Sequence, residues 1–279
     1  MDSLQPAGSI WAHRSTPEAT IRSMFRSRKS SLPLLLGVLS AVTAAAGCST
    51  RAKPDLQPLE LTGPVSVHVE SFAGDVTIKS TDGPAYIVLD GEALHANNRS
   101  TDAVTALETI QWTTELDNDE RGPRLVVRVD SGSSESHLLR GHVTVRVPVV
   151  DGVYVRTRRG DVSIDEMTGP VDIRTSDGGI ELLSDQPLRD SISMFTNDGN
   201  VHVRVAPGSS GTFDLHADHG TSHVSVKSGK LIVRGHSSEE LFNGVLNDGT
   251  NPITIRTTDG SIWFVVKPNP KLRGILQFP

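Results

Sequence analysis

The chain of 279 residues carries 27 lysine and arginine residues against 33 aspartate and glutamate residues, a net charge of −6 at pH 7. An acidic balance without a basic patch argues against nucleic acid or an anionic membrane surface as a partner. Cys48 is the only cysteine, so the chain forms no internal disulfide and a hydrophobic core must hold the fold.

Residues 1–47 have the order of a signal peptide. An apolar run from Leu32 to Ala46 follows a basic stretch and ends in small residues. The run is shorter than the roughly 20 residues of a transmembrane helix, which favours export and cleavage over a permanent span. Met24 opens a leader of ordinary proportions and is an alternative start to Met1. The basic stretch contains Arg22, Arg26, Arg28 and Lys29.

Cys48 follows this leader directly, in the sequence Ala45-Ala46-Gly47-Cys48. The stretch resembles the lipobox of bacterial lipoproteins, whose cysteine receives lipid such as palmitate. Ala45 stands where leucine is commonest, so ordinary cleavage that leaves Cys48 unmodified stays open. In the proteobacterial sorting rule, Ser49 goes with the outer membrane. We therefore expect a lipid-anchored envelope protein with a polar tether over residues 48–58.

From residue 59 onward, short runs of alternating Val, Ile and Leu are separated by Gly, Asp and Asn, which is typical of strands and tight turns. One phrase recurs, in which a Gly at a turn precedes two apolar residues in alternation. Its copies are residues 73–78, 159–164, 177–182, 198–203 and 259–264, with a weaker copy at 247–255.

The glycines of this phrase set a period. Gly160, Gly178, Gly199 and Gly220 are 18, 21 and 21 residues apart, and a half-step of nine residues recurs. This spacing predicts a solenoid whose coils each hold about two strand-and-turn units and bury an apolar pair from each strand. The predicted inward pairs are Val162/Ile164, Val171/Ile173, Ile180/Leu182, Val201/Val203, Val224/Val226, Leu231/Val233, Ile253/Ile255 and Ile262/Phe264.

The first half of this region is less regular. Residues 93–108 hold either a short helix or a loop, whereas residues 125–129 and 142–147 have strand patterns. We expect an all-β fold over residues 59–279, a right-handed β-solenoid or β-helix with irregular insertions in its N-terminal half. The apolar tail, residues 274–279, is expected to cover an open end of the column, so deletion of residues 271–279 should lower solubility.

The repeated phrase resembles that of the bacterial putative adhesin family, which is related to the head domains of autotransporter adhesins. The resemblance covers roughly residues 60–267 and rests on periodicity, not on fixed catalytic residues. It implies a β-solenoid fold more firmly than it implies adhesion, and the molecular function in that family is generally unestablished.

Two sets of polar residues are candidates for chemistry. The first set is a row of turn aspartates. Stacked coils could align them into an acidic ladder that binds Ca²⁺ or carries out acid/base chemistry, or the aspartates could cap the turns. Their position beside Gly favours caps. His216, His219 and His223 lie near Asp214 and Asp218, but a strand pattern points His216 and His219 oppositely, which argues against zinc or copper. We expect no metal and no cofactor. The turn aspartates are Asp75, Asp82, Asp161, Asp177, Asp198, Asp248 and Asp259.

The sequence contains no nucleophile elbow and no phosphate-binding loop, and its one cysteine is assigned to the anchor, so we expect no catalytic residues and no enzyme. Trp263 lies between Ile262 and Phe264 and faces outward if those two face the core, which makes it a candidate contact residue. We expect a non-catalytic envelope lipoprotein, an adhesin or scaffold that presents a solenoid face to a protein or glycan. The alternatives are a polysaccharide-acting enzyme on a β-helix face and an envelope sensor or structural component.

Overall fold

The computed structural model describes residues 49–95, 100–119 and 122–272. The predicted signal peptide, its alternative start Met24, the predicted lipid site Cys48 and residues 273–279 lie outside the described residues. Within the described part, no helix is long and apolar enough to cross a membrane.

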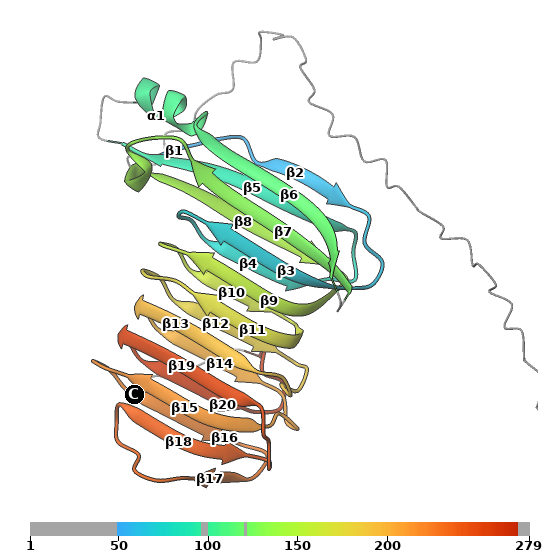
Figure 1. Ribbon diagram of the computed structural model, residues 1–279, viewed down its shortest axis with the longest axis vertical. Coiled ribbons are helices and arrows are strands. Elements are labelled where there is room, and N and C mark those ends of the chain that lie inside the picture. The colour runs from blue at the N-terminus through green and yellow to red at the C-terminus, as the bar shows by residue number, and fades with distance from the viewer. Residues whose placement is uncertain (1–48, 96–99, 120–121, 273–279) are drawn as a thin grey trace, which may run out of the picture. The chain divides into compact units, whose positions relative to one another are not determined.

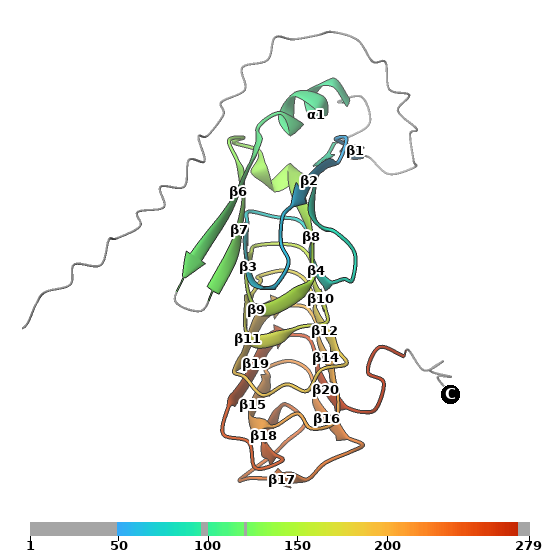
Figure 2. The same cartoon turned by 90° about the vertical axis from the view of Figure 1, so that its right-hand side faces the viewer.

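The described residues form a column of two ten-stranded β-sheets that face each other (Figure 1 and Figure 2). Sheet A has the order β1 (Ser49–Arg51), β5 (Ala85–Leu94), β8 (Leu139–Val147), β4 (Val76–Ser80), β10 (Val162–Asp165), β12 (Ile180–Ser184), β14 (Val201–Val205), β20 (Ile262–Val266) and β16 (Ser222–Val226), and β2 (Asp55–Leu59) also pairs with β5. Sheet B has the order β17 (Leu231–Val233), β18 (Leu241–Leu246), β15 (Gly211–Ala217), β19 (Pro252–Asp259), β13 (Ile192–Asp198), β11 (Thr168–Arg174), β9 (Val149–Thr157), β3 (Pro64–Ser71), β7 (Gly122–Ser131) and β6 (Ile110–Asp119).

Each coil of the column contributes one strand to each sheet. Neighbouring coils pair in parallel and in register, so Val162 lies beside Ile180 and Ile180 beside Val201. This all-β, β-helix-like repeat is the architecture that the period predicts. The right-handed winding stays a prediction. The irregular stretch contains the helix α1 (Ser100–Leu107), which together with β5 and β6 is inserted between the coil strands β4 and β7.

The apolar core fills the space between the sheets. In six of the eight predicted inward pairs both side chains are buried, and each such Val or Ile contributes about 1.5–3 kcal/mol. The prediction is wrong for Val233, which is 55% exposed, and Val224 and Val226 are only half-buried. The reason is position, because β16 and β17 are the last strands of their sheets and no further coil covers them.

Two coils stack out of sequence order. The first coil, β3 with β4, lies between the coil of β7 and β8 and the coil of β9 and β10. The last coil, β19 with β20, lies between that of β13 and β14 and that of β15 and β16. The segment after β20 therefore leaves from inside the stack: Nζ of Lys271 lies 2.9 Å from Asp165 and 2.7 Å from Glu166. The apolar tail, residues 274–279, lies outside the described residues, so the expectation that it covers an open end stays a prediction.

The repeat glycines form one continuous column of close backbone contacts. A β-carbon on Gly160 would collide with the carbonyl group of Gly74, and one on Gly178 would collide with that of Gly160. The same collision would occur between every two neighbouring glycines of this column. The coils therefore approach each other more closely here than a residue with a β-carbon would allow. In stacking order the column is Gly141, Gly74, Gly160, Gly178, Gly199, Gly260 and Gly220.

Antiparallel strands close both ends of the column. At one end, residues predicted as a polar tether form β1 and β2 instead, both paired with β5. The tether prediction missed them because these strands are held by backbone pairing and show little apolar alternation; Leu56 on β2 is 59% exposed. At the same end, the β6–β7 hairpin projects beyond the sheet (Figure 2). β7 pairs with β3 only from Arg124 onward, so Gly122 and Pro123 at the start of β7 have no paired residue on β3.

Candidate functional site

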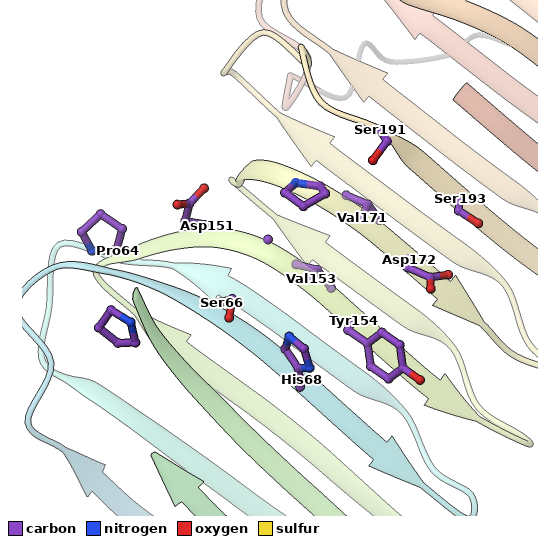
Figure 3. A pocket seen from close by; sticks show the side chains of 13 residues that line it. Pro64, Ser66, His68, Asp151, Val153, Tyr154, Val171, Asp172, Ser191 and Ser193 are labelled. Carbon is purple, nitrogen blue, oxygen red and sulfur yellow. The ribbon is translucent and has the colours of Figure 1, made fainter. Parts of the chain in front are cut away.

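A groove of about 460 Å³ lies on the outer face of sheet B, across β3, β9, β11 and β13 (Figure 3). We call it the sheet B groove. Pro123, on the diverging β6–β7 hairpin, forms one wall. The pairing shifts register at Asp151 and Gly152 of β9 and at Gly169 and Pro170 of β11, and these irregularities shape the floor. Three prolines line a strip of otherwise regular sheet, which keeps the rim rigid because proline has a fixed φ. The prolines are Pro64, Pro123 and Pro170.

An aromatic pair occupies the middle of the sheet B groove. His68 and Tyr154 are paired in register on β3 and β9, and their rings stack with centroids 5.2 Å apart and planes 23° from parallel. The guanidinium of Arg156 lies 4.1 Å from the Tyr154 ring centroid and also pairs with Asp172 at 2.6 Å. These contacts fix the tyrosine in place. The groove therefore presents a pre-positioned ring beside polar groups.

Hydroxyl and carboxylate groups surround this pair. Ser66, Ser191 and Ser193 line the sheet B groove with the carboxylates of Asp151 and Asp172. Serine hydroxyls donate and accept hydrogen bonds and carboxylates accept them, so these groups can bind sugar hydroxyls beside the Tyr154 and His68 rings. None of these residues stood out in the sequence, because each is a single outward position on a strand and repeats no pattern.

The turn aspartates hold neighbouring coils together. Oδ1 of Asp75 accepts the backbone N–H of Asp161 at 3.0 Å, and Oδ1 of Asp161 accepts that of Gly179 at 2.8 Å. Asn200 does the same for the N–H of Ser261 at 2.9 Å. Asp75 and Asp161 therefore stabilise turns, as predicted for turn caps. Each side chain, however, accepts a backbone N–H from the turn of the neighbouring coil and not from its own turn.

The aligned aspartates and the histidine cluster do not converge on a metal site. Asp177 and Asp198 are bridged in register, as are Asp198 and Asp259, and His219 lies 3.0 Å from Asp259. His216 is on β15 of sheet B and lies 3.2 Å from Asp218, whereas His223 is on β16 of sheet A. Within the described residues, no group of three or more His, Cys, Asp or Glu is arranged to hold a metal ion.

Trp263 lies on the outer face of sheet A, with both sequence neighbours buried, as the alternation predicts. Its indole stacks on the His202 ring at a centroid distance of 4.5 Å with planes 1° from parallel. Burial, followed by the charge of Arg204, lowers the pKa of His202 below its ordinary value. Its role as a contact residue stays a prediction.

His142 on β8 lies between two carboxylates. Its Nδ1 is 3.3 Å from Asp75 and its Nε2 is 3.2 Å from Glu92. The hydrogen bond to Asp75 is the largest influence and raises the pKa of His142 above its ordinary value. Glu92 also faces Arg51 on β1 at 3.6 Å. This network joins β1, β4, β5 and β8 at the end of the column where the described chain begins.

Three comparisons bear on these features. The family described as Toastrack DUF4097 matches residues 137–263, which include β8 to β19 and the start of β20. A putative cell adhesion protein from Clostridium sporogenes is 12% identical, with 77% of this chain and 99% of that chain covered and a TM-score of 0.46. A putative adhesin from Bacteroides fragilis is 10% identical, with 77% and 97% covered and a TM-score of 0.32. No curated protein matches the chain significantly.

Proposed function

We propose that this chain is a non-catalytic lipoprotein of the cell envelope, an adhesin or scaffold that binds a glycan on the outer face of sheet B. The observation that carries the proposal is the stacked pair of His68 and Tyr154 within a groove of hydroxyl and carboxylate groups. A glycan is favoured over a protein because the groove lining has few large apolar side chains that would anchor a protein partner.

The coiled core supports a scaffolding role. In the floor of the sheet B groove, β9 and β11 each form backbone hydrogen bonds with a parallel strand on both sides. A rigid floor lowers the entropy lost on binding, so a shallow groove retains affinity. Binding then requires no closure of a lid or loop.

The test compares two tyrosines that each lie beside an arginine. Tyr154 in the groove has Arg156 over its ring, and Tyr86 on sheet A has Arg146 at 5.6 Å from its ring centroid. On a glycan array, Tyr154→Ala should lower the binding of the retained glycan at least tenfold, whereas Tyr86→Ala should leave it unchanged. Equal binding by both variants, or no glycan retained by the wild type, contradicts the proposal. Cleavage of a retained oligosaccharide would favour the polysaccharide-acting enzyme instead.

The anchor is a separate part of the proposal and rests on the sequence around Cys48. Cys48→Ala should release the protein from the membrane fraction and abolish labelling by palmitate, with no effect on folding. Continued membrane association of this variant, or an unlabelled wild type, would remove the anchor. Fractionation of inner and outer membranes tests the expected outer-membrane location.

A further inference from the structure

A second groove, of about 550 Å³, lies beyond the sheet B groove where β3, β7, β9 and β11 end. We call it the arginine groove, because Arg128, Arg156, Arg158 and Arg174 line it against only two carboxylates, Glu70 and Asp130. The lining is therefore positive on a chain whose net charge is −6. In the sequence only Arg156 and Arg158 stand close together, because the four residues come from three separate strands and the turn after β9.

Two of the four guanidinium groups are already neutralised. Arg128 lies between Glu70 at 3.4 Å and Glu115 at 3.5 Å. Arg156 is committed to Asp172 at 2.6 Å and to two backbone carbonyl groups. These pairs account for most of the neighbouring carboxylates and leave the other two arginines with little negative charge of their own.

Arg174 and Arg158 retain donors for a ligand. The Nε atom of Arg174 is 3.9 Å from Asp172, its side chain is 60% exposed, and its guanidinium lies 5.1 Å from the Phe195 ring centroid. The exposed Arg158 side chain makes no ion pair with any described residue. Guanidinium groups bind carboxylate, sulfate and phosphate oxygens through paired N–H donors, and the Phe195 ring holds one of them in a defined direction.

The two grooves are adjacent along the same strands. Arg156 follows Tyr154 by two residues, roughly 7 Å along a strand. Tyr154 lines the sheet B groove, and Arg156 lines the arginine groove. An oligosaccharide that contacts Tyr154 in the sheet B groove therefore places its next units beside Arg174 and Arg158.

We propose that the arginine groove binds the anionic groups of an acidic glycan, with Arg158 and Arg174 as the residues that select it over a neutral glycan. This inference rests on the proposed function, because it assigns the charge class of the glycan bound in the sheet B groove. The carboxylate of a uronic acid and the phosphate of a polyol phosphate share this chemistry, so the experiment includes both.

The experiment measures binding of three probes to the purified full chain: oligogalacturonate, its fully methyl-esterified form, and poly(glycerol phosphate). The wild type should bind at least one anionic probe, and the R158Q/R174Q variant should bind it at least tenfold more weakly. Arg256→Gln is the matched control, since Arg256 lies in the same row of sheet B but pairs with Asp214 at 2.9 Å. This control should bind as the wild type does, and added salt should weaken binding of the anionic probe more than that of the ester.

The outcomes separate the inference from the proposed function. Equal binding of the anionic probes by the wild type and by R158Q/R174Q overturns the inference. If Tyr154→Ala still loses binding in that case, the proposed function stands alone. Binding of the ester as tight as that of oligogalacturonate also overturns the inference. If the wild type binds none of the three probes, the inference fails, and the glycan array decides the proposed function.

Discussion

The carbonyl group of Gly74 occupies the space that a β-carbon on Gly160 would need, although the two residues are far apart in the sequence. The contact exists because the first coil stacks directly on the coil of β9 and β10. Each glycine of the column repeats this contact with its neighbour. The stack is therefore as tight at its glycine edge as backbone atoms permit.

Gly160→Ala should destabilise the fold strongly. Gly160 has φ of +122°, which costs an alanine about 1–2 kcal/mol, and the collision with Gly74 adds about 1–3 kcal/mol. Gly122→Ala is the matched control, since Gly122 has φ of +126° with nothing within 4 Å of the added carbon. Urea unfolding should show the larger loss for Gly160→Ala. Equal losses would mean that backbone strain alone, and not the stacking contact, requires the glycine.

The two substitutions Asp161→Asn and Asp161→Ala separate a turn role from an ionic role. The N–H of Gly179 needs only an acceptor oxygen, and Asn200 already supplies one at the equivalent position of another coil. Asp161→Asn should therefore change the free energy of unfolding little, whereas Asp161→Ala should lower it by about 0.5–1.5 kcal/mol. A large loss for the asparagine variant, measured by thermal unfolding, would show that the charge itself is required.

The inward pairs could be predicted from sequence because burial imposes alternation on every strand that another coil covers. Val162 and Ile164 follow it, and Val233 departs from it because β17 has no covering coil. Stacking order could not be predicted in this way. The phrase at 259–264 has the same pattern as that at 198–203, a glycine followed by two alternating apolar residues, so either fits beside any parallel neighbour. Spacing along the chain does not specify the partner.

The candidate site was hidden from sequence for a related reason. His68, Tyr154 and Asp172 become neighbours only through in-register pairing of β3, β9 and β11. Their positions face solvent, where burial imposes no pattern on residue type. Trp263 could be assigned to the outer face because its two neighbours are strongly apolar, but its stacking partner His202 lies on another coil and could not be identified.

The network around His142 predicts a pH optimum for stability. Because the pKa of His142 is raised in the folded state, the charged ring stabilises the fold. This stabilisation is fully present below pH 6.5, the ordinary pKa, and is lost as the pH rises through the higher pKa of the folded state. The hydrogen bond with His142 lowers the pKa of Asp75. Burial alone would raise the pKa of Glu92, but hydrogen bonds with Ser49 and His142 lower it below its ordinary value. These carboxylates lose their contribution as the pH falls below about 4 to 5, from ordinary values of 3.8 and 4.5.

Chemical unfolding between pH 4 and pH 9 should therefore show a decline on the alkaline side that His142→Gln removes. The expected loss is on the order of 1 kcal/mol, since Asp75 is half exposed and solvent weakens that pair. His137→Gln is the control, because His137 lies on the nearby 3₁₀ turn Ser136–Leu138 and has no carboxylate partner among the ion pairs of the described residues. An alkaline decline that persists in His142→Gln would assign it to another group.

The stack of Trp263 on His202 gives an optical measure of the outer face of sheet A. Because burial, with Arg204, lowers the pKa of His202, its ring stays neutral below pH 6.5 and becomes charged only at a lower pH. A charged imidazole quenches an indole at stacking distance, so tryptophan fluorescence should fall with a midpoint below 6.5. His202→Gln should abolish this step, and Trp263→Phe should remove it together with part of the emission, leaving that of Trp112 in the chain from Cys48 onward. A midpoint above 6.5 would mean that the pair is more hydrated than its geometry indicates, and a ligand that covers Trp263 would shift the midpoint further down.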